Sequence, residues 1–402
     1  MDHHANLFIR LNANLNSKKM ENMKSKIVIL FVSLALFLSS AFAQDTEEAP
    51  VVDTSVKISG LWFMAYRGNI PSEGDNSFGL KRGYLTFKKR FNETFSIRYT
   101  QDITIDKEGD DAGNVELRFK YCYIKADLPE FLFFKQPFVE VGLVHQPWIE
   151  FEQKINTYRV QGKMFMEKYG VTSSADFGVN VVSLLGGKLD DEARKKVDSS
   201  LPGKYGSISL GVYNGGGYHA PEMNNNKTVE GRLTLRPFPG FAPGLQFSYG
   251  FATGQGNDTL NTPYNYNIFF ASHETAKTTL TAQYYRGYGF HGGGVGYNEG
   301  YSIFAELCIP FTPLVVFGRY DHFTEDYPII MLNDLDDTIL YPDDYTQNNI
   351  LIAGVAWKFY NRNRLLFDIE HSSKSGWVDP LSSSIPAPIT NTTAELALEI
   401  VF

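Results

Sequence analysis

Apolar and polar residues alternate with a period of two along most of this chain. In the run TFSIRYTQDITID, the apolar face consists of Phe95, Ile97, Tyr99, Ile103 and Ile105. The opposite face is polar and includes Arg98 and Asp102. About sixteen such runs follow one another, each near the ~10 residues with which a tilted strand crosses a bilayer. Because a helix would repeat every 3.6 residues, the pattern predicts an all-β chain.

The run VELRFKYCYIK shows the same alternation. One face consists of Val115, Leu117, Phe119, Tyr121 and Tyr123. The other face consists of Glu116, Arg118, Lys120 and Cys122. The period therefore predicts that Cys122 shares a face with the charged residues.

The connections between these runs alternate in length. RFNE, ETAK, PFTP and YNRN are short, whereas the segments between them are long and polar or Gly-rich, the longest being 146–176 and 323–347. Short turns at one end and long loops at the other are typical of an outer-membrane barrel. An even strand count places both termini on the periplasmic side. The segment KLDDEARKKVDSSLPGK falls among the short turns, which indicates either a small helical insertion or a wrong register there.

Two features favour lipid on the outside over a secreted β-sandwich. Aromatic residues gather at strand ends, in GLWFMAY, FLFF, AQYYRGYGF and AWKFY, as they do in interfacial girdles. The run TTAELALEIVF ends on Phe402 and resembles the C-terminal signal by which the barrel-assembly machinery recognises its clients. We therefore expect a transmembrane antiparallel up-and-down β-barrel of about sixteen strands over residues 55–402, embedded in outer-membrane lipid.

The N-terminal part of the chain has the pattern of an export signal. MKSKIVILFVSLALFLSSAFA, residues 23–43, combines a basic start, a short apolar core and a small-residue cleavage site. A retained anchor helix is the alternative. Residues 1–19 look like an over-called start, so we assign 1–43 to that start plus the signal peptide, and 44–54 to a short periplasmic leader. We expect a protein of a Gram-negative bacterium.

Charge and cysteine content narrow the function further. Removing the five bases and two acids of residues 1–43 from the 37 bases and 45 acids of the chain leaves a formal net charge of −11. An acidic exported protein is a poor binder of nucleic acid. Cys122 and Cys308 fall on the fourth and twelfth predicted strands, on opposite walls of the barrel. Since a disulfide needs Cα atoms within ~7 Å, we expect two free thiols.

Several segments resemble the phosphate-selective porin O/P family over roughly the first two thirds of the exported chain. They are LKRGYLTFKKRFNETFSIRYTQD, VELRFKYCYIKAD, FVEVGLVHQPWIEFE, FMEKYG and SISLGVYNGGG. Lys81 stands where that family has one of two paired arginines. The resemblance implies a homotrimeric porin through which small hydrophilic solutes or ions, anions such as phosphate among them, diffuse passively.

If the apolar faces contact lipid, the charged residues of the opposite faces point inward and are candidates for the pore lining. They include Arg82, Arg98, Asp102, Glu116, Arg118, Lys120, Arg232, Arg236, Arg319 and Asp321. Neither sign dominates, so solvated or paired charges are the simpler interpretation. Arg82, Arg98 and Arg118 lie on three successive strands and form a local basic cluster, the candidate step for anions.

The connection 146–176 is too rich in apolar and aromatic residues for an exposed loop. We expect it to fold into the lumen and to present Glu150, Glu152, Arg159 and Lys163 at a constriction. Packing against a neighbouring subunit is the alternative.

Two other functions stay open beside a porin: a non-conducting structural or adhesive barrel, and an outer-membrane hydrolase. Asp321 precedes His322, and His371 follows Glu370, yet both histidines fall on the predicted lipid-facing side. No phosphate-binding loop, dinucleotide fingerprint or Cys-pair metal site occurs in the sequence. We therefore predict no catalytic residues, no metal and no cofactor.

Overall fold

The computed structural model describes residues 52–70, 76–107, 109–110, 112–197, 201–332, 338–360, 362–376 and 388–402. The predicted signal peptide, residues 1–43, and the leader up to residue 51 lie outside these ranges. Among the helices of the described ranges, none is long and apolar enough to span a membrane.

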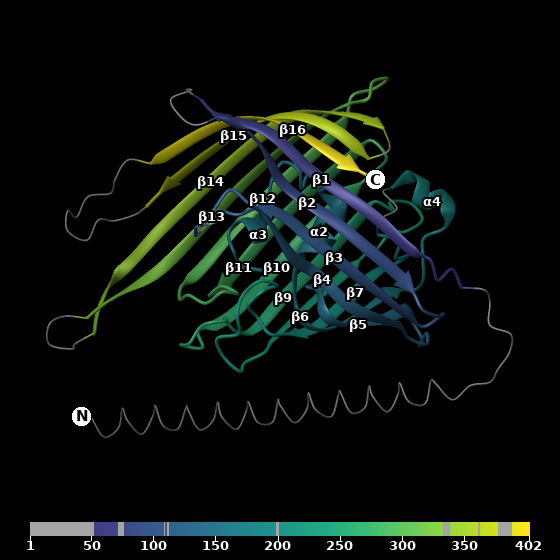
Figure 1. Cartoon of the computed structure of the whole chain (residues 1–402), viewed down its shortest axis with the longest axis horizontal. Coiled ribbons are helices and arrows are strands. Elements are labelled where there is room, and N and C mark those ends of the chain that lie inside the picture. The colour runs from purple at the N-terminus through teal and green to yellow at the C-terminus, as the bar shows by residue number, and fades with distance from the viewer. Residues whose placement is uncertain are drawn as a thin grey trace. The chain divides into compact units, whose positions relative to one another are not determined.

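Sixteen antiparallel strands form a closed barrel in which each strand pairs with its neighbours in sequence and β16 pairs with β1 (Figure 1). The first eight strands are β1 (Val56–Asn69), β2 (Ser77–Arg90), β3 (Phe95–Ile105), β4 (Val115–Asp127), β5 (Phe134–His145), β6 (Ala175–Leu185), β7 (Gly206–Tyr213) and β8 (Thr228–Leu235). The others are β9 (Leu245–Gln255), β10 (Pro263–Glu274), β11 (Thr278–Tyr288), β12 (Tyr297–Cys308), β13 (Leu314–Leu332), β14 (Thr338–Tyr360), β15 (Asn363–Ser375) and β16 (Ile389–Val401). The predicted up-and-down barrel is confirmed.

The barrel is apolar outside and polar inside. Large hydrophobic side chains that are about half exposed on the outer surface include Leu117, Phe119, Phe269, Ile303, Leu351 and Phe367. Charged side chains that are nearly inaccessible inside include Asp102, Glu230, Arg319, Asp368 and Glu399. This distribution of apolar and polar side chains is the reverse of that in a soluble protein, and it is typical of a barrel surrounded by lipid.

A bulge in the pairing of β3 with β4 reverses the alternation along β4. Thr100 pairs with Tyr121 and Gln101 with Phe119, so Lys120 is the extra residue. Beyond it, Tyr121 is buried inside whereas Cys122 is exposed. The prediction that Cys122 shares the inward face was wrong, because one inserted residue shifts every later side chain to the other face. Both cysteines are free thiols, as predicted.

Two of the connections between strands contain regular secondary structure. Segment 323–347, predicted to be a loop, is mostly strand, because β13 and β14 continue through it. The pairing of β13 with β14 continues to Leu332 opposite Thr338, so the ladder extends beyond the runs from which the two strands were predicted. The turn between β6 and β7 contains helix α4 (Asp191–Lys196), whose first turn is capped by Asp190 accepting from the Ala193 amide at 2.7 Å. The predicted helical insertion is confirmed.

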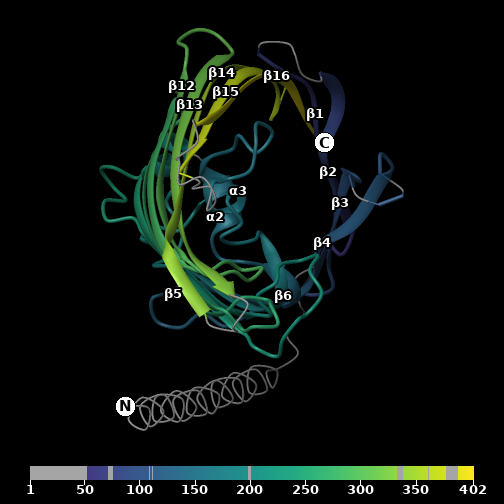
Figure 2. The same ribbon diagram turned by 90° about the vertical axis from the view of Figure 1, so that its left-hand side faces the viewer.

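Residues 146–174, here called the lumen loop, leave β5 and fold into the barrel, as predicted. The loop contains helices α2 (Ile149–Ile155) and α3 (Phe165–Lys168). Figure 2 shows both helices inside the ring of strands. The apolar side chains of the lumen loop are buried against the barrel wall, and this burial supplies the driving force that keeps the loop inside.

Candidate channel lining

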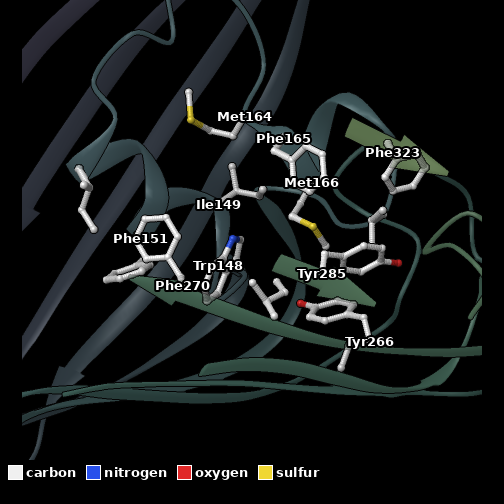
Figure 3. Packing of buried hydrophobic residues seen from close by; sticks show 14 of the residues in the cluster. Trp148, Ile149, Phe151, Met164, Phe165, Met166, Tyr266, Phe270, Tyr285 and Phe323 are labelled. Carbon is white, nitrogen blue, oxygen red and sulfur yellow. The ribbon is translucent and has the colours of Figure 1, made fainter. Parts of the chain in front are cut away.

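The two ends of the lumen loop, around helices α2 and α3, pack on residues of strands β9 to β13. Trp148 meets Phe270 edge to face, with ring centroids 5.7 Å apart (Figure 3). Phe165 and Tyr169 pack on Phe323, the Tyr169 ring stacked at 4.2 Å. Each of these contacts replaces water against an aromatic face, so this side of the loop cannot line a passage.

The middle of the loop covers strands β12 to β16. Tyr158 stacks on Phe317 with ring centroids 4.2 Å apart, and Val160 is fully buried in the same cluster. Together the two clusters occupy the wall from β9 through β16 to β1 and β2, since the second cluster includes Phe63, Ala65 and Tyr84. The wall that these apolar clusters leave free, here called the uncovered wall, is formed by strands β3 to β8.

Four basic side chains of the wall donate hydrogen bonds to backbone carbonyls of the loop. The donor and acceptor pairs, at 2.7–3.1 Å, are Arg232 with Pro147, Arg364 with Thr157, Lys81 with Gln161, and Arg319 with Lys163. Bonds from charged donors are stronger than neutral ones. These bases therefore fasten the loop across its length.

The loop and a turn cover several side chains that the sequence placed in the pore lining. Arg319 points inward but lies behind the loop, where it pairs with Asp321 at 2.6 Å. Arg236 donates to backbone carbonyls of Gly203 and Leu201 in the turn between β6 and β7. Arg232 is 7% exposed. Their inward orientation agrees with the alternation, and their immediate role is to hold the loop and the turn.

The uncovered wall brings together other predicted residues. Asp102 accepts from Arg82 at 2.5 Å and from Arg118 at 3.2 Å, and Glu116 lies 3.6 Å from Arg118. The hydroxyl of Tyr218, from the loop after β7, also donates to Asp102 at 3.1 Å. Two of the three arginines of the predicted basic cluster are thus offset by Asp102, and the third, Arg98, lies 3.7 Å from Glu150.

At two β-bulges, one in β4 and one in β2, two consecutive residues both point into the barrel. Lys120 lies with its ammonium 4.4 Å from the centroid of the Tyr84 ring and 3.2 Å from its hydroxyl. Lys81 is the extra residue of a bulge between β1 and β2, so it and Arg82 both point inward. Lys81 pairs with Glu395. Strict alternation places Lys81 on the face opposite Arg82, and Lys81 was not among the residues predicted to line the pore.

The four predicted constriction residues of the loop have different surroundings. Glu150 and Lys163 reach the lumen, whereas Arg159 pairs with Glu167 of the same loop at 3.2 Å. Glu152 is buried and accepts from the indole of Trp148 at 3.0 Å. Burial raises the pKa of Glu152 to about 7, against the opposing effect of Arg319.

Cavities remain between the loop and the uncovered wall, toward the turn end of the barrel. One of 470 Å³ is lined by eight basic residues, against three acidic ones. The bases are Lys57, Lys88, Lys89, Arg90, Arg98, Lys125, Lys154 and Arg232. A second cavity of 280 Å³ is lined by residues that include Tyr84, Lys120 and Tyr121. The turn end of the lumen is therefore basic, although the chain as a whole is acidic.

Solved barrels of outer-membrane proteins have the same fold. An anion-selective porin from Comamonas acidovorans aligns over 87% of this chain and 100% of its own, with a TM-score of 0.55 and 12% identity. The trimer form of OmpT from Vibrio cholerae aligns over 87% of this chain and 99% of its own, with a TM-score of 0.51 and 9% identity. OmpF of Salmonella typhi, in complex with daunomycin, aligns over 87% of this chain and 98% of its own, with a TM-score of 0.51 and 12% identity.

The likeness is one of fold. Porins are among these structures, and all three align over nearly their whole length. No protein-family model and no curated protein matches the sequence. The resemblance to phosphate-selective porins therefore rests on the short motifs alone.

Proposed function

We propose that this protein is a porin of the bacterial outer membrane through which small hydrophilic solutes diffuse passively. The observation that carries the proposal is the fastened lumen loop, which covers one wall and leaves polar cavities along the other. A loop that narrows a barrel without filling it forms a size-limited path. The porins among the solved structures of the same fold support this proposal.

We further propose that the path prefers anions, phosphate among them. In the predicted cluster, Asp102 offsets Arg82 and Arg118, and Glu150 lies 3.7 Å from Arg98. The surplus of bases around the larger cavity provides the attractive field instead. Clustered charge of one sign in a narrow, low-dielectric passage raises the local concentration of counter-ions.

Assembly and location follow from the same proposal. We expect insertion in the outer membrane with both termini periplasmic, recognition of the Phe402 strand by the barrel-assembly machinery, and a homotrimer. The OmpT structure of similar fold is described as a trimer.

The test is the planar-bilayer conductance of refolded residues 44–402 under a salt gradient. Stepwise openings with an anion-selective reversal potential are the expected result. Openings with a cation-selective potential would overturn the anion preference. A folded, heat-modifiable barrel without openings would overturn the proposed porin function and favour a non-conducting structural barrel. The many ion pairs inside the lumen would then support that alternative.

A hydrolase has less support. His371 is exposed and pairs with Thr392, away from the inward Glu370. His322 stacks on Tyr301, which is itself 39% exposed on the outer surface. Asp321 points inward and pairs with Arg319. The histidines and carboxylates that are adjacent in sequence are thus on opposite faces of their strands.

A further inference from the structure

His145, the last residue of β5, lies between two carboxylates. Its Nδ1 is 2.9 Å from Glu140 and its Nε2 is 2.5 Å from Glu150. Glu140 belongs to the same strand, whereas Glu150 belongs to helix α2 of the lumen loop. His145 therefore joins the uncovered wall to the loop, on the side opposite the loop's apolar contacts.

A second group competes for the same ring nitrogen. Nη1 of Arg98 lies 2.9 Å from Nε2 of His145. A protonated Nε2 donates to Glu150, whereas an unprotonated Nε2 accepts from Arg98, and it cannot do both. Nδ1 donates to Glu140 in either state. The proton on Nε2 therefore decides whether His145 holds Glu150 or Arg98.

This group of residues lies across the free part of the lumen. Arg98 and Glu150 line both the 470 Å³ and the 280 Å³ cavities, so the pair stands between them. The charged and titratable groups around the ring are Arg98 on β3, Tyr121 and Tyr123 on β4, Glu140 on β5, and Glu150 and Lys154 on α2.

We propose that His145 is a positioning residue that holds Glu150 across the passage as a proton-dependent latch, an inference that rests on the proposed channel function. With a protonated ring, Glu150 is fixed between His145 and Arg98 and divides the lumen. When the ring loses its proton, Arg98 donates to it and Glu150 loses its shortest contact. The two cavities then join, and the passage widens as pH rises through the range in which histidine titrates.

The first test compares single-channel conductance between about pH 6 and about pH 9, because the two carboxylates beside the ring favour its protonated form beyond the ordinary range of histidine titration. We expect wild-type conductance to increase with pH, and His145→Asn and Glu150→Gln to show the higher conductance throughout. His371→Asn, which removes an exposed histidine on the outer surface, is the matched control and should keep the wild-type profile. The same pH profile in wild type and His145→Asn would overturn the latch.

A second test does not require conduction. Gln153→Cys, in a chain that also carries Cys122→Ser and Cys308→Ser, places a thiol on the wall of the smaller cavity. Its reaction with a charged methanethiosulfonate should be slower with His145 than with His145→Asn at acidic pH and equal at alkaline pH. Equal modification rates of the two chains at both pH values would refute the latch. A pH-dependent difference in rate, found in a barrel that does not conduct, would support the latch and refute the proposed porin function.

Discussion

The ring of Phe402 lies over Gly60, at the seam where β16 meets β1. A Cβ on Gly60 would be 2.1 Å from the ring. The two residues also exchange backbone hydrogen bonds of 2.8 and 3.1 Å. Gly60 thus provides the space in which the aromatic ring completes the closure of the barrel.

Substitution Gly60→Val should therefore displace Phe402 and lower the folded fraction, since overpacking typically costs ~1–3 kcal/mol. The measurement is the yield of the heat-modifiable band on gels after refolding. Gly79→Val on β2 is the control, because a Cβ there meets nothing within 4 Å. If both variants fold alike, the seam does not depend on this contact.

Asp102 offsets two arginines, and its charge should set the selectivity of the uncovered wall. Asp102→Asn leaves Arg82 and Arg118 without their shared carboxylate, so the reversal potential should shift toward anions. Glu116→Gln removes a more exposed carboxylate beside Arg118 and should produce a smaller shift, because water screens its charge. Equal shifts from the two variants would contradict this assignment.

Arg364 connects the lumen loop to a buried carboxylate. Its Nε lies 2.6 Å from Glu399, and its Nη2 donates to the carbonyl of Thr157. Arg364→Met should destabilise the barrel by ~3–5 kcal/mol, because it leaves the Glu399 charge buried without a partner. The double variant Arg364→Met/Glu399→Leu should recover part of that loss. The urea-unfolding midpoint measures both, and a double variant less stable than the single one would disprove the pairing argument.

Glu152 should make stability depend on pH. Its pKa is raised from 4.5 to about 7 because it is buried. The folded chain therefore keeps the proton that the unfolded chain releases, and its stability falls as pH rises from 4.5 to about 7. Glu152→Gln removes this penalty and should be more stable than wild type by about 3 kcal/mol at pH 8, by the conversion of 1.36 kcal/mol per pKa unit. The two chains should unfold at similar urea concentrations at pH 4, and a less stable variant at pH 8 would contradict the prediction.

The alternation of apolar and polar residues predicted the barrel because a period of two is a local property. The residues of each strand by themselves indicate which of its two faces contacts lipid. The same rule failed at Tyr121 and Cys122 and at Lys81, where a bulge inserts one residue. Bulges are set by pairing with the next strand, and the periodicity of a single strand does not contain that information.

The sequence by itself determined the strand order, the inward orientation of most charged residues and the entry of the lumen loop, since all three follow from local hydrophobicity. Only the tertiary structure decided which charges reach the passage. Arg319 fastens the loop, Asp102 offsets two arginines, and His145, which no motif singled out, meets Glu150. Arg319 contacts the loop carbonyl of Lys163, Asp102 contacts arginines of the two neighbouring strands, and His145 meets Glu150 because the loop folds back against β5. The periodicity of a single strand does not contain the information for any of these contacts.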